Sequence, residues 1–175
     1  KKYSRKHKGR KVLVAGSFLY NEKYNDIDLF VISKYNKEDY RDGEVHINYL
    51  PEDIEKTLFF QSIAAISITN FKPAAEIEER FSMGEILRLY EMIVLLIMQG
   101  DDYLQELRHF VIRAEYISNG VVLNSMQLKM ATDRFAKRKN PIKFINKYLI
   151  TKILGSYGEA AVKKTLNEFI EKNST

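Results

Sequence analysis

The chain has 175 residues, of which 45% are hydrophobic and 29% are charged, and its formal net charge at pH 7 is +5. This is the composition of an ordinary globular protein, long enough for one generous domain or two small ones. The chain has no cysteine, which excludes disulfides, thiolate metal sites and a cysteine nucleophile. It also has no run of 18 apolar residues and no signal-peptide core, so we expect a cytoplasmic protein without a membrane partner.

The basic residues are concentrated in two segments. The first begins at Lys1, ends at Lys11 and carries seven lysines or arginines. Such a run predicts a solvated arm, and RNA binding is the alternative that its charge allows. The second segment predicts a solvated helix surface or, together with the arm, an electrostatic track for RNA or another polyanion. It comprises Arg134, Lys137, Arg138, Lys139, Lys143 and Lys147.

Two short apolar runs enclose a polar segment near the start of the chain. Residues 12–15 and 27–32 are each long enough for a buried strand and too short for a core helix. Gly16 and Ser17 break the first run. A short helix is expected over residues 18–22, before the second strand begins.

The second of these strands carries two acidic residues, Asp26 and Asp28. Because side chains alternate along a strand, the two carboxylates point to one face, about 6–7 Å apart along the backbone. Neighbouring carboxylates repel each other unless a cation neutralises them. Hard oxygen ligands of this kind suit Mg²⁺ or Mn²⁺.

Gly16-Ser17 followed by Asp26-Ile27-Asp28 resembles the signature of the DNA polymerase beta superfamily of nucleotidyltransferases. In that family a strand ends in Gly-Ser, a helix follows, and the next strand carries an Asp-x-Asp pair. The resemblance implies that Gly16 and Ser17 hold the triphosphate of an NTP such as ATP, and that Asp26 and Asp28 bind the metal ions. A glycine permits close backbone approach, and a pair of metals stabilises the attacking and leaving oxygens of the transfer.

Residues 44–50 alternate like a third strand, with Glu44, His46 and Asn48 on one face. In the family, a third carboxylate on this strand completes the metal site and accepts the proton of the incoming hydroxyl. The corresponding position here is Asn48, a departure, because an amide can ligate a metal but cannot accept a proton. His46 and Glu44, which lies about 13 Å from Asn48 along the strand, are the alternatives for the base. Lys23 is a candidate phosphate ligand, with an exposed loop lysine as the alternative.

The rest of the chain changes from mixed to helical character. Residues 33–43 are polar, with a turn signal at Asp42-Gly43. We then expect a helix over residues 52–61, a strand over 64–71 and a short helix over 73–80. A succession of helices follows, because apolar positions recur at helical spacing. Their starts are indicated by capping residues at Ser82, Asp101, Ser125, Asn140 and Ser156.

We therefore predict an α/β (α+β) fold in which a nucleotidyltransferase-like domain with a small mixed sheet, residues 1–72, precedes an all-helical bundle domain, residues 73–175. The resemblance implies Mg²⁺- or Mn²⁺-dependent transfer of a nucleoside monophosphate from an NTP to a hydroxyl of a small molecule, a protein or an RNA end. The alternative, which Asn48 supports, is a nucleotide-binding or interaction module with little or no turnover, such as a toxin–antitoxin component.

Overall fold

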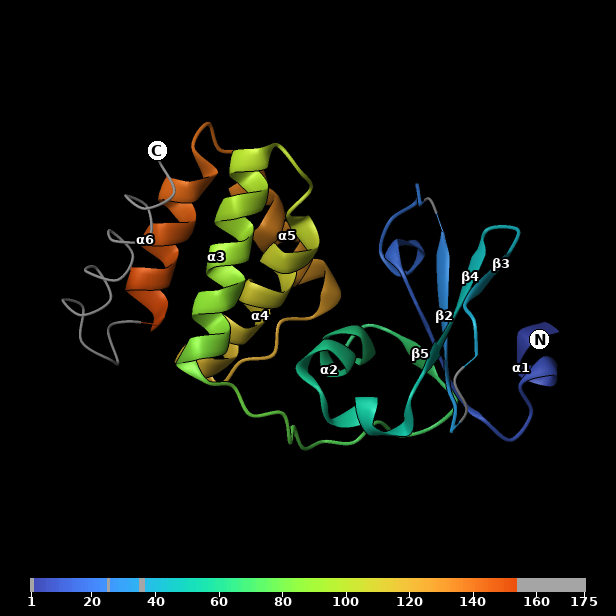
Figure 1. The fold of residues 1–175 in the computed structure, drawn as a ribbon. Helices are drawn as coiled ribbons and strands as arrows, with labels where there is room; N and C mark the ends of the chain where they lie inside the picture. Colours follow the sequence, from blue (N-terminus) through green and yellow to red (C-terminus); the bar gives the residue numbers. More distant parts are fainter. Residues whose placement is uncertain (1, 25, 35–36, 154–175) are drawn as a thin grey trace. The chain divides into compact units, whose positions relative to one another are not determined.

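The computed structural model describes residues 2–24, 26–34 and 37–153. Its chain divides into two compact units, Lys1–Arg80 with Asn124–Gln127 and Phe81–Leu123 with Leu128–Thr175. The β-sheet belongs to the first unit, and the longest helices belong to the second (Figure 1). The predicted combination of a small mixed sheet with helices is confirmed. The domain boundary between residues 72 and 73 remains a prediction.

A five-stranded mixed sheet forms the centre of the first unit. The strand order is β3-β4-β2-β1-β5, in which β2 lies parallel to β4 and all other neighbours are antiparallel. The expected strands over residues 12–15, 27–32 and 44–50 are confirmed to within one residue at each end. The strands are β1 (Lys11–Ala15), β2 (Ile27–Ile32), β3 (Tyr40–Asp42), β4 (Val45–Leu50) and β5 (Ile68–Thr69).

The central strands β1 and β2 bury apolar side chains on both faces of the sheet. This is why each of them reads as a continuous apolar run in the sequence and not as an alternating one. Because successive side chains point to opposite faces, the two strands contribute side chains to two separate core clusters, one on each face of the sheet. The first cluster comprises Val12, Leu29, Val31 and Ile47, and the second comprises Leu13, Ala15, Ile32 and Phe60.

The segment after β1 is shorter than predicted. Instead of a helix over residues 18–22, a single 3₁₀ turn, η1 (Ser17–Leu19), follows the strand. Eight residues separate Ser17 from Asp26, and a 3₁₀ turn closes within fewer residues than an α-helix. The chain therefore returns to the sheet through a tight turn and a loop.

The helix expected over residues 52–61 is interrupted. It forms as η2 (Glu52–Lys56) and α2 (Leu58–Ala64), because Thr57 between them has an extended conformation with φ −93° and ψ 152°. The Thr57 hydroxyl oxygen accepts a hydrogen bond from the amide of Phe60 and so caps α2.

Residues 64–80 contain less regular structure than predicted. The strand expected over residues 64–71 is reduced to the two residues of β5, since α2 extends to Ala64. The helix expected over residues 73–80 is absent, because this segment makes tertiary bonds instead. The Glu78 amide donates to the Lys56 carbonyl over 3.1 Å, and the Glu79 carboxylate accepts from the Leu58 amide over 2.9 Å.

The basic N-terminal segment is folded onto the sheet. Its first residues form α1 (Lys2–Lys6), Tyr3 packs against the first core cluster, and His7 is 3% exposed. The Lys6 ammonium donates to the Tyr40 hydroxyl over 2.6 Å. The expectation of a solvated arm is therefore wrong for the part of this segment that the structure describes. Tyr3 packs against the core and His7 is buried, so the segment is part of the folded unit.

The second unit is built from helices with the predicted end signals. The capping box of α3 is present, since the Ser82 hydroxyl accepts from the Glu85 amide and the Glu85 carboxylate accepts from the Ser82 amide. Gly100 and Gly120 end α3 and α4 in the left-handed conformation. The helix expected after Ser156 lies outside the described residues. The helices are α3 (Met83–Gln99), α4 (Leu104–Asn119), α5 (Ser125–Ala136) and α6 (Pro141–Ile153).

The starts of α4 and α5 differ slightly from the predicted ones. Asp102, and not Asp101, accepts a hydrogen bond from the Leu104 amide at the start of α4. Asn124, one residue before the predicted Ser125, accepts from the Gln127 amide of α5. None of the described helices combines the length and the apolar composition that crossing a bilayer requires. Buried positions recur at helical spacing, as in Ile86, Tyr90, Ile93, Leu107, Phe110, Ala114, Ile145 and Leu149.

Candidate functional site

The Gly16-Ser17 turn lies at the end of β1, directly beside Asp28 on β2 and Asp26 just before that strand. Ala15 pairs with Asp28 in the antiparallel register of β1 and β2, and the chain turns immediately afterwards. Gly16 has φ +122°, which L side chains rarely adopt, and a Cβ there would lie 3.4 Å from both the Asp26 carbonyl oxygen and the Asp28 amide nitrogen. The positive φ is therefore what favours glycine here, whereas 3.4 Å is an ordinary van der Waals distance, and the turn lies against the backbone of the Asp-x-Asp segment.

The two remaining residues of the predicted phosphate site differ in their positions. Ser17 begins η1, and its carbonyl accepts from the amides of Tyr20 and Asn21 over 3.1 and 2.8 Å, which fixes the turn. Lys23 is exposed in the loop that follows. Within the described part of the chain, its ammonium has no ion-pair partner. Of the predicted phosphate ligands, Gly16 is the one that lies against the Asp-x-Asp backbone. Ser17 is its neighbour in the chain, and Lys23 lies in the loop beyond.

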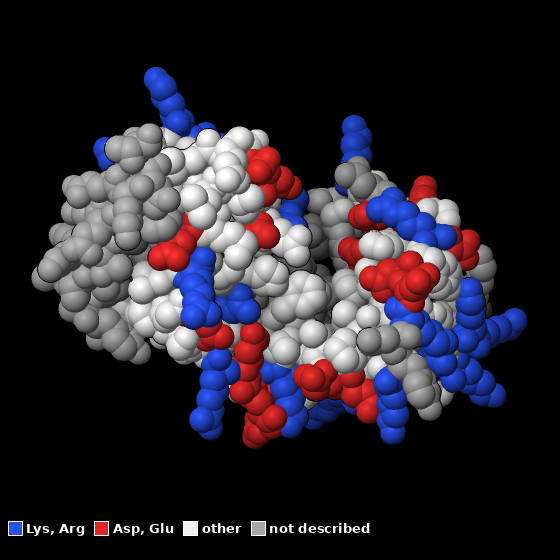
Figure 2. All heavy atoms as spheres, viewed as in Figure 1, with Lys and Arg blue, Asp and Glu red and all other residues white. Residues whose placement is uncertain are grey.

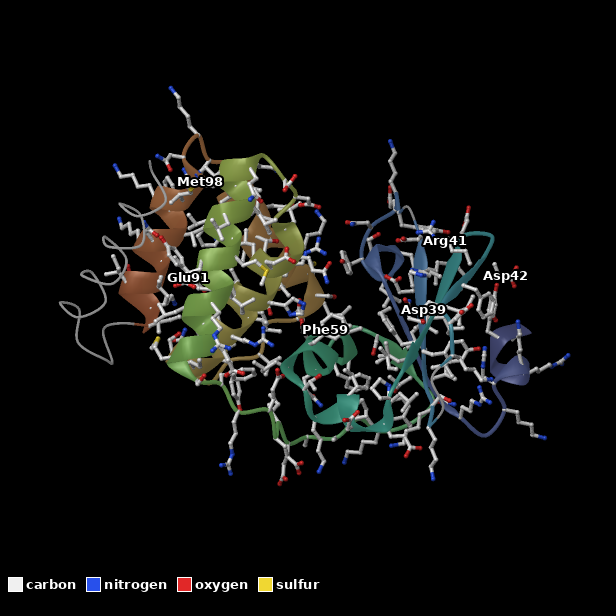
Figure 3. The ribbon with its side chains drawn as sticks, viewed as in Figure 1. Asp39, Arg41, Asp42, Phe59, Glu91 and Met98 are labelled. Carbon is white, nitrogen blue, oxygen red and sulfur yellow. The ribbon has the colours of Figure 1, made fainter. Side chains whose placement is uncertain are left out.

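A row of paired residues crosses the sheet at the level of Asp28. Arg41 on β3 pairs with His46 on β4, His46 pairs with Asp28 on β2, and Asp28 pairs with Ala15 on β1. Paired residues share a face, on which Asp26, two residues before Asp28, also lies. His46 Nδ1 is 3.8 Å from Asp28 Oδ1, and a guanidinium nitrogen of Arg41 is 3.6 Å from Asp26 Oδ2 (Figure 3 labels Arg41 on β3).

The ionised form of Asp28 is disfavoured at this position. Burial raises the pKa of the Asp28 carboxyl, and the neighbouring Asp26 carboxylate raises it further. His46, a hydrogen bond from Asn48, and Arg41 act in the opposite direction without cancelling these effects. A half-buried carboxylate of this kind is stabilised either by a proton or by a cation that approaches it.

The three candidates for the third catalytic group lie at different distances from the aspartates. In the parallel register His46 is level with Asp28, whereas Asn48 lies two residues farther along β4. The Asn48 amide group donates to the His46 carbonyl over 3.4 Å and also to the Asp28 carboxylate. Glu44 precedes β4, and its side chain is exposed. Of the three, His46 is the titratable group that the register places beside Asp28.

Arg41 is a site residue that the sequence analysis missed. It lies in β3, within a polar segment for which only the turn at Asp42-Gly43 is predicted. Gly43, with φ +64°, and Glu44 form a two-residue connection between β3 and β4. A glycine at the first position of a two-residue loop is a known hairpin signal, and a loop at Gly43-Glu44 places Arg41 opposite His46. An Asp42-Gly43 loop would instead have placed Arg41 opposite Glu44.

The two aspartates fit a divalent cation that arrives with a phosphate ligand. Mg²⁺ is usually held by one or two carboxylates, with water and substrate phosphates at its other positions. Asp26 and Asp28 supply such a pair, and the raised pKa of Asp28 means that a cation would stabilise its ionised form. Among the residues that the structure describes, no group of three or more His, Asp or Glu side chains is placed to hold a metal ion. The site therefore does not fit a cation held by protein side chains alone.

The site joins a glycine-dependent turn, a carboxylate pair and an imidazole on one face of the sheet. Together these groups can bind a polyphosphate through a shared cation and accept a proton beside it. The chain matches no protein-family model, and no curated protein sequence is significantly similar to it. The chemistry of these side chains is therefore the basis for a functional proposal.

Proposed function

We propose that the chain is a cytoplasmic, Mg²⁺-dependent nucleotidyltransferase, which moves a nucleoside monophosphate from an NTP such as ATP to a hydroxyl of a small molecule, a protein or an RNA. The position of Gly16 carries the proposal. Because this turn lies against the backbone of Asp26-Ile27-Asp28, a triphosphate on the turn and a cation on the carboxylates would be neighbours. The same arrangement is implied by the resemblance to the DNA polymerase beta superfamily.

In this proposal each group on the sheet face has one role. The hydroxyl of Ser17 and the amides of the turn hold the triphosphate, and Asp26 and Asp28 hold the cation. The cation, when bound, supplies charge neutralisation at the phosphoryl oxygens. His46 accepts the proton of the acceptor hydroxyl. His46 Nδ1 lies 3.8 Å from Asp28 Oδ1, so the proposed proton acceptor and a proposed cation ligand are neighbours.

A specific observation favours a second function, a nucleotide-binding module with little or no turnover. Arg41 lies 3.6 Å from Asp26, and Asn48 donates a hydrogen bond to Asp28. Groups of the chain itself therefore partly satisfy both carboxylates. In addition, Asn48 is a hydrogen-bond donor where the family has its third carboxylate, so it accepts no proton. Such a module would bind ATP without releasing pyrophosphate.

Pyrophosphate release from ATP in the presence of Mg²⁺ separates the two functions, with water as the default acceptor. We expect slow release by the wild type and no release by His46→Ala, because the imidazole is the proposed proton acceptor. Asn48→Asp adds a second acceptor to the same face and should accelerate release by about 10²–10⁴-fold, the usual contribution of a general base.

Two further variants make the outcome decisive. Loss of release in Glu44→Gln, with His46→Ala still active, would assign the base to Glu44 and contradict the role given to His46. Release by no variant, while ATP still binds, would establish the non-catalytic module. Asp53→Asn, which removes an exposed acid on η2, is the control and should behave as the wild type does.

A further inference from the structure

The connection between α5 and α6 carries a dense group of exposed cations, which we call the α5–α6 corner. Lysine and arginine side chains project from this end of the helical unit in Figure 2. The neighbouring acid, Asp133, already pairs with Lys129 at 3.0 Å. Among the described residues, no acidic side chain forms an ion pair with any cation of the corner. The corner comprises Arg134, Lys137, Arg138, Lys139, Lys143 and Lys147, all of which are exposed.

The helix that presents half of this corner is fixed in the unit. Ile145 and Leu149 of α6 are fully buried, so Lys143 and Lys147, four residues apart, share the outward face of the helix. The Tyr148 hydroxyl donates to Glu115 of α4 over 2.5 Å. Lys143 and Lys147 therefore project in the same direction from a helix that is held in place by its buried face and by the hydrogen bond to α4.

The connection between the helices is also held in place. The Asn140 side chain accepts a hydrogen bond from the Lys143 amide over 3.0 Å and so caps the start of α6, and Pro141 occupies the first helical position, where its fixed φ suits the helix. This cap sets the direction in which the chain enters α6. Lys139, immediately before the cap, is thereby kept near the cations of the helix.

An aromatic ring lies among these cations. The guanidinium carbon of Arg138 is 4.4 Å from the centre of the Phe144 ring, and Phe144 is 38% exposed. Core packing does not explain an exposed ring at this position, because the buried face of α6 is formed by Ile145 and Leu149. The stacked pair instead offers a planar surface of the kind on which a nucleobase stacks.

We propose that the α5–α6 corner binds single-stranded nucleic acid. Its lysines and arginines contact backbone phosphates, and the Arg138–Phe144 pair stacks with a base. A strand with splayed bases uses both features, whereas a duplex or an acidic protein would use the cations alone. A membrane surface would require a larger apolar face beside the cations. Binding requires neither ATP nor a metal ion, so the inference is independent of the proposed nucleotidyl transfer.

Fluorescence anisotropy of a labelled uridine homopolymer, titrated with the full chain at increasing salt, tests the phosphate contacts. Each contact on a single strand contributes about 0.7 to the slope of log affinity against log salt. Lys139→Gln with Lys143→Gln should therefore make the slope shallower by about 1.4 and weaken binding about 25-fold at 0.1 M salt. Arg88→Gln with Arg108→Gln, which removes equal charge from exposed positions of α3 and α4, should leave both quantities near the wild-type values.

Phe144→Leu tests the stacking contact, because it keeps apolar bulk and removes the aromatic plane. It should weaken binding about 5- to 100-fold without changing the salt slope, and its thermal unfolding should confirm that it folds. Wild-type affinity in this variant would overturn the proposal. So would undetectable binding at low salt, equal binding of a duplex, or binding of phosphatidylserine vesicles in place of the single strand.

A deoxyuridine homopolymer and one further variant complete the test. Equal binding of the two homopolymers supports single strands of either sugar, and a preference for the uridine homopolymer assigns the site to RNA, since only the 2′-hydroxyl distinguishes them. Asp26→Asn with Asp28→Asn should bind the single strand as the wild type does. Loss of binding in this variant would contradict the independence of the corner from the sheet site.

Discussion

At Asp28 the fold holds a carboxylate whose ionised form is disfavoured. Burial is the largest cause of its raised pKa, and the Asp26 carboxylate is the next. A raised pKa in the folded state means that the native protein binds this proton more tightly than the unfolded chain does. The wild type therefore loses stability as pH rises from the unfolded pKa, about 3.9, through the raised pKa of the folded state. The loss is complete once the folded carboxyl is ionised, and a cation bound to the carboxylate would offset it.

Asp28→Asn should accordingly be more stable than the wild type at pH 7 in the absence of divalent cations. The difference should disappear below about pH 4, where the unfolded carboxyl is protonated as well. Thermal unfolding across this pH range measures it. Asp53→Asn, which removes an exposed acid, should show no such difference. An Asp28→Asn variant that is less stable than the wild type at pH 7 would contradict the environment described for this carboxylate.

The residues of the site were predictable from the sequence to different degrees. Gly16, Asp26 and Asp28 follow from local rules, because a break between two short apolar runs and the alternation of a strand place them together. The choice between His46 and Asn48 depends on the register of β2 and β4, which are parallel and therefore not joined by a hairpin that would fix their register. No local pattern encodes that register, so the sequence leaves both residues as candidates.

At the scale of whole elements, local capping signals decide which helices the sequence reveals. The Ser82 capping box predicts the start of α3, and the structure contains both of its hydrogen bonds. In contrast, residues 73–80 have a helical pattern but bond to η2 and α2 instead. The predicted strand over 64–71 fails in part because α2 continues to Ala64. Tertiary contacts, which no short window of sequence contains, override the local preference in these segments.

The cap of α3 gives a direct prediction of stability. Ser82→Ala removes the hydroxyl that accepts from the Glu85 amide, and we expect it to lower the free energy of unfolding by about 1 kcal/mol. Denaturant unfolding monitored by circular dichroism measures this change. Ser125→Ala, at the start of α5 where Asn124 supplies the cap, is the matched control and should cost much less. Equal losses in the two variants would show that the α3 cap has no special role.

At the scale of the whole molecule, the two basic segments of the sequence have different structural roles. In the N-terminal segment Lys6 donates to Tyr40, and Lys11 pairs with the buried Glu55, so cations of this segment take part in the folding of the sheet unit. The cations of the α5–α6 corner have no acidic partner in the described part of the chain. Both segments are strongly basic in composition, which cannot distinguish their roles, because the difference lies in contacts between distant residues.

The central claim is that Asp26 and Asp28 bind a nucleotide-borne cation, and the thermal shift caused by ATP with Mg²⁺ or Mn²⁺ tests it most directly. A ligand that binds only the folded protein stabilises it by about 2.7 kcal/mol at a hundred times its Kd, so the melting temperature of the wild type should rise. Asp26→Asn with Asp28→Asn should remove this increase. Asp53→Asn with Asp101→Asn, an equal charge change at exposed positions, should retain it. An undiminished shift in the Asp26/Asp28 double variant would contradict the proposed site.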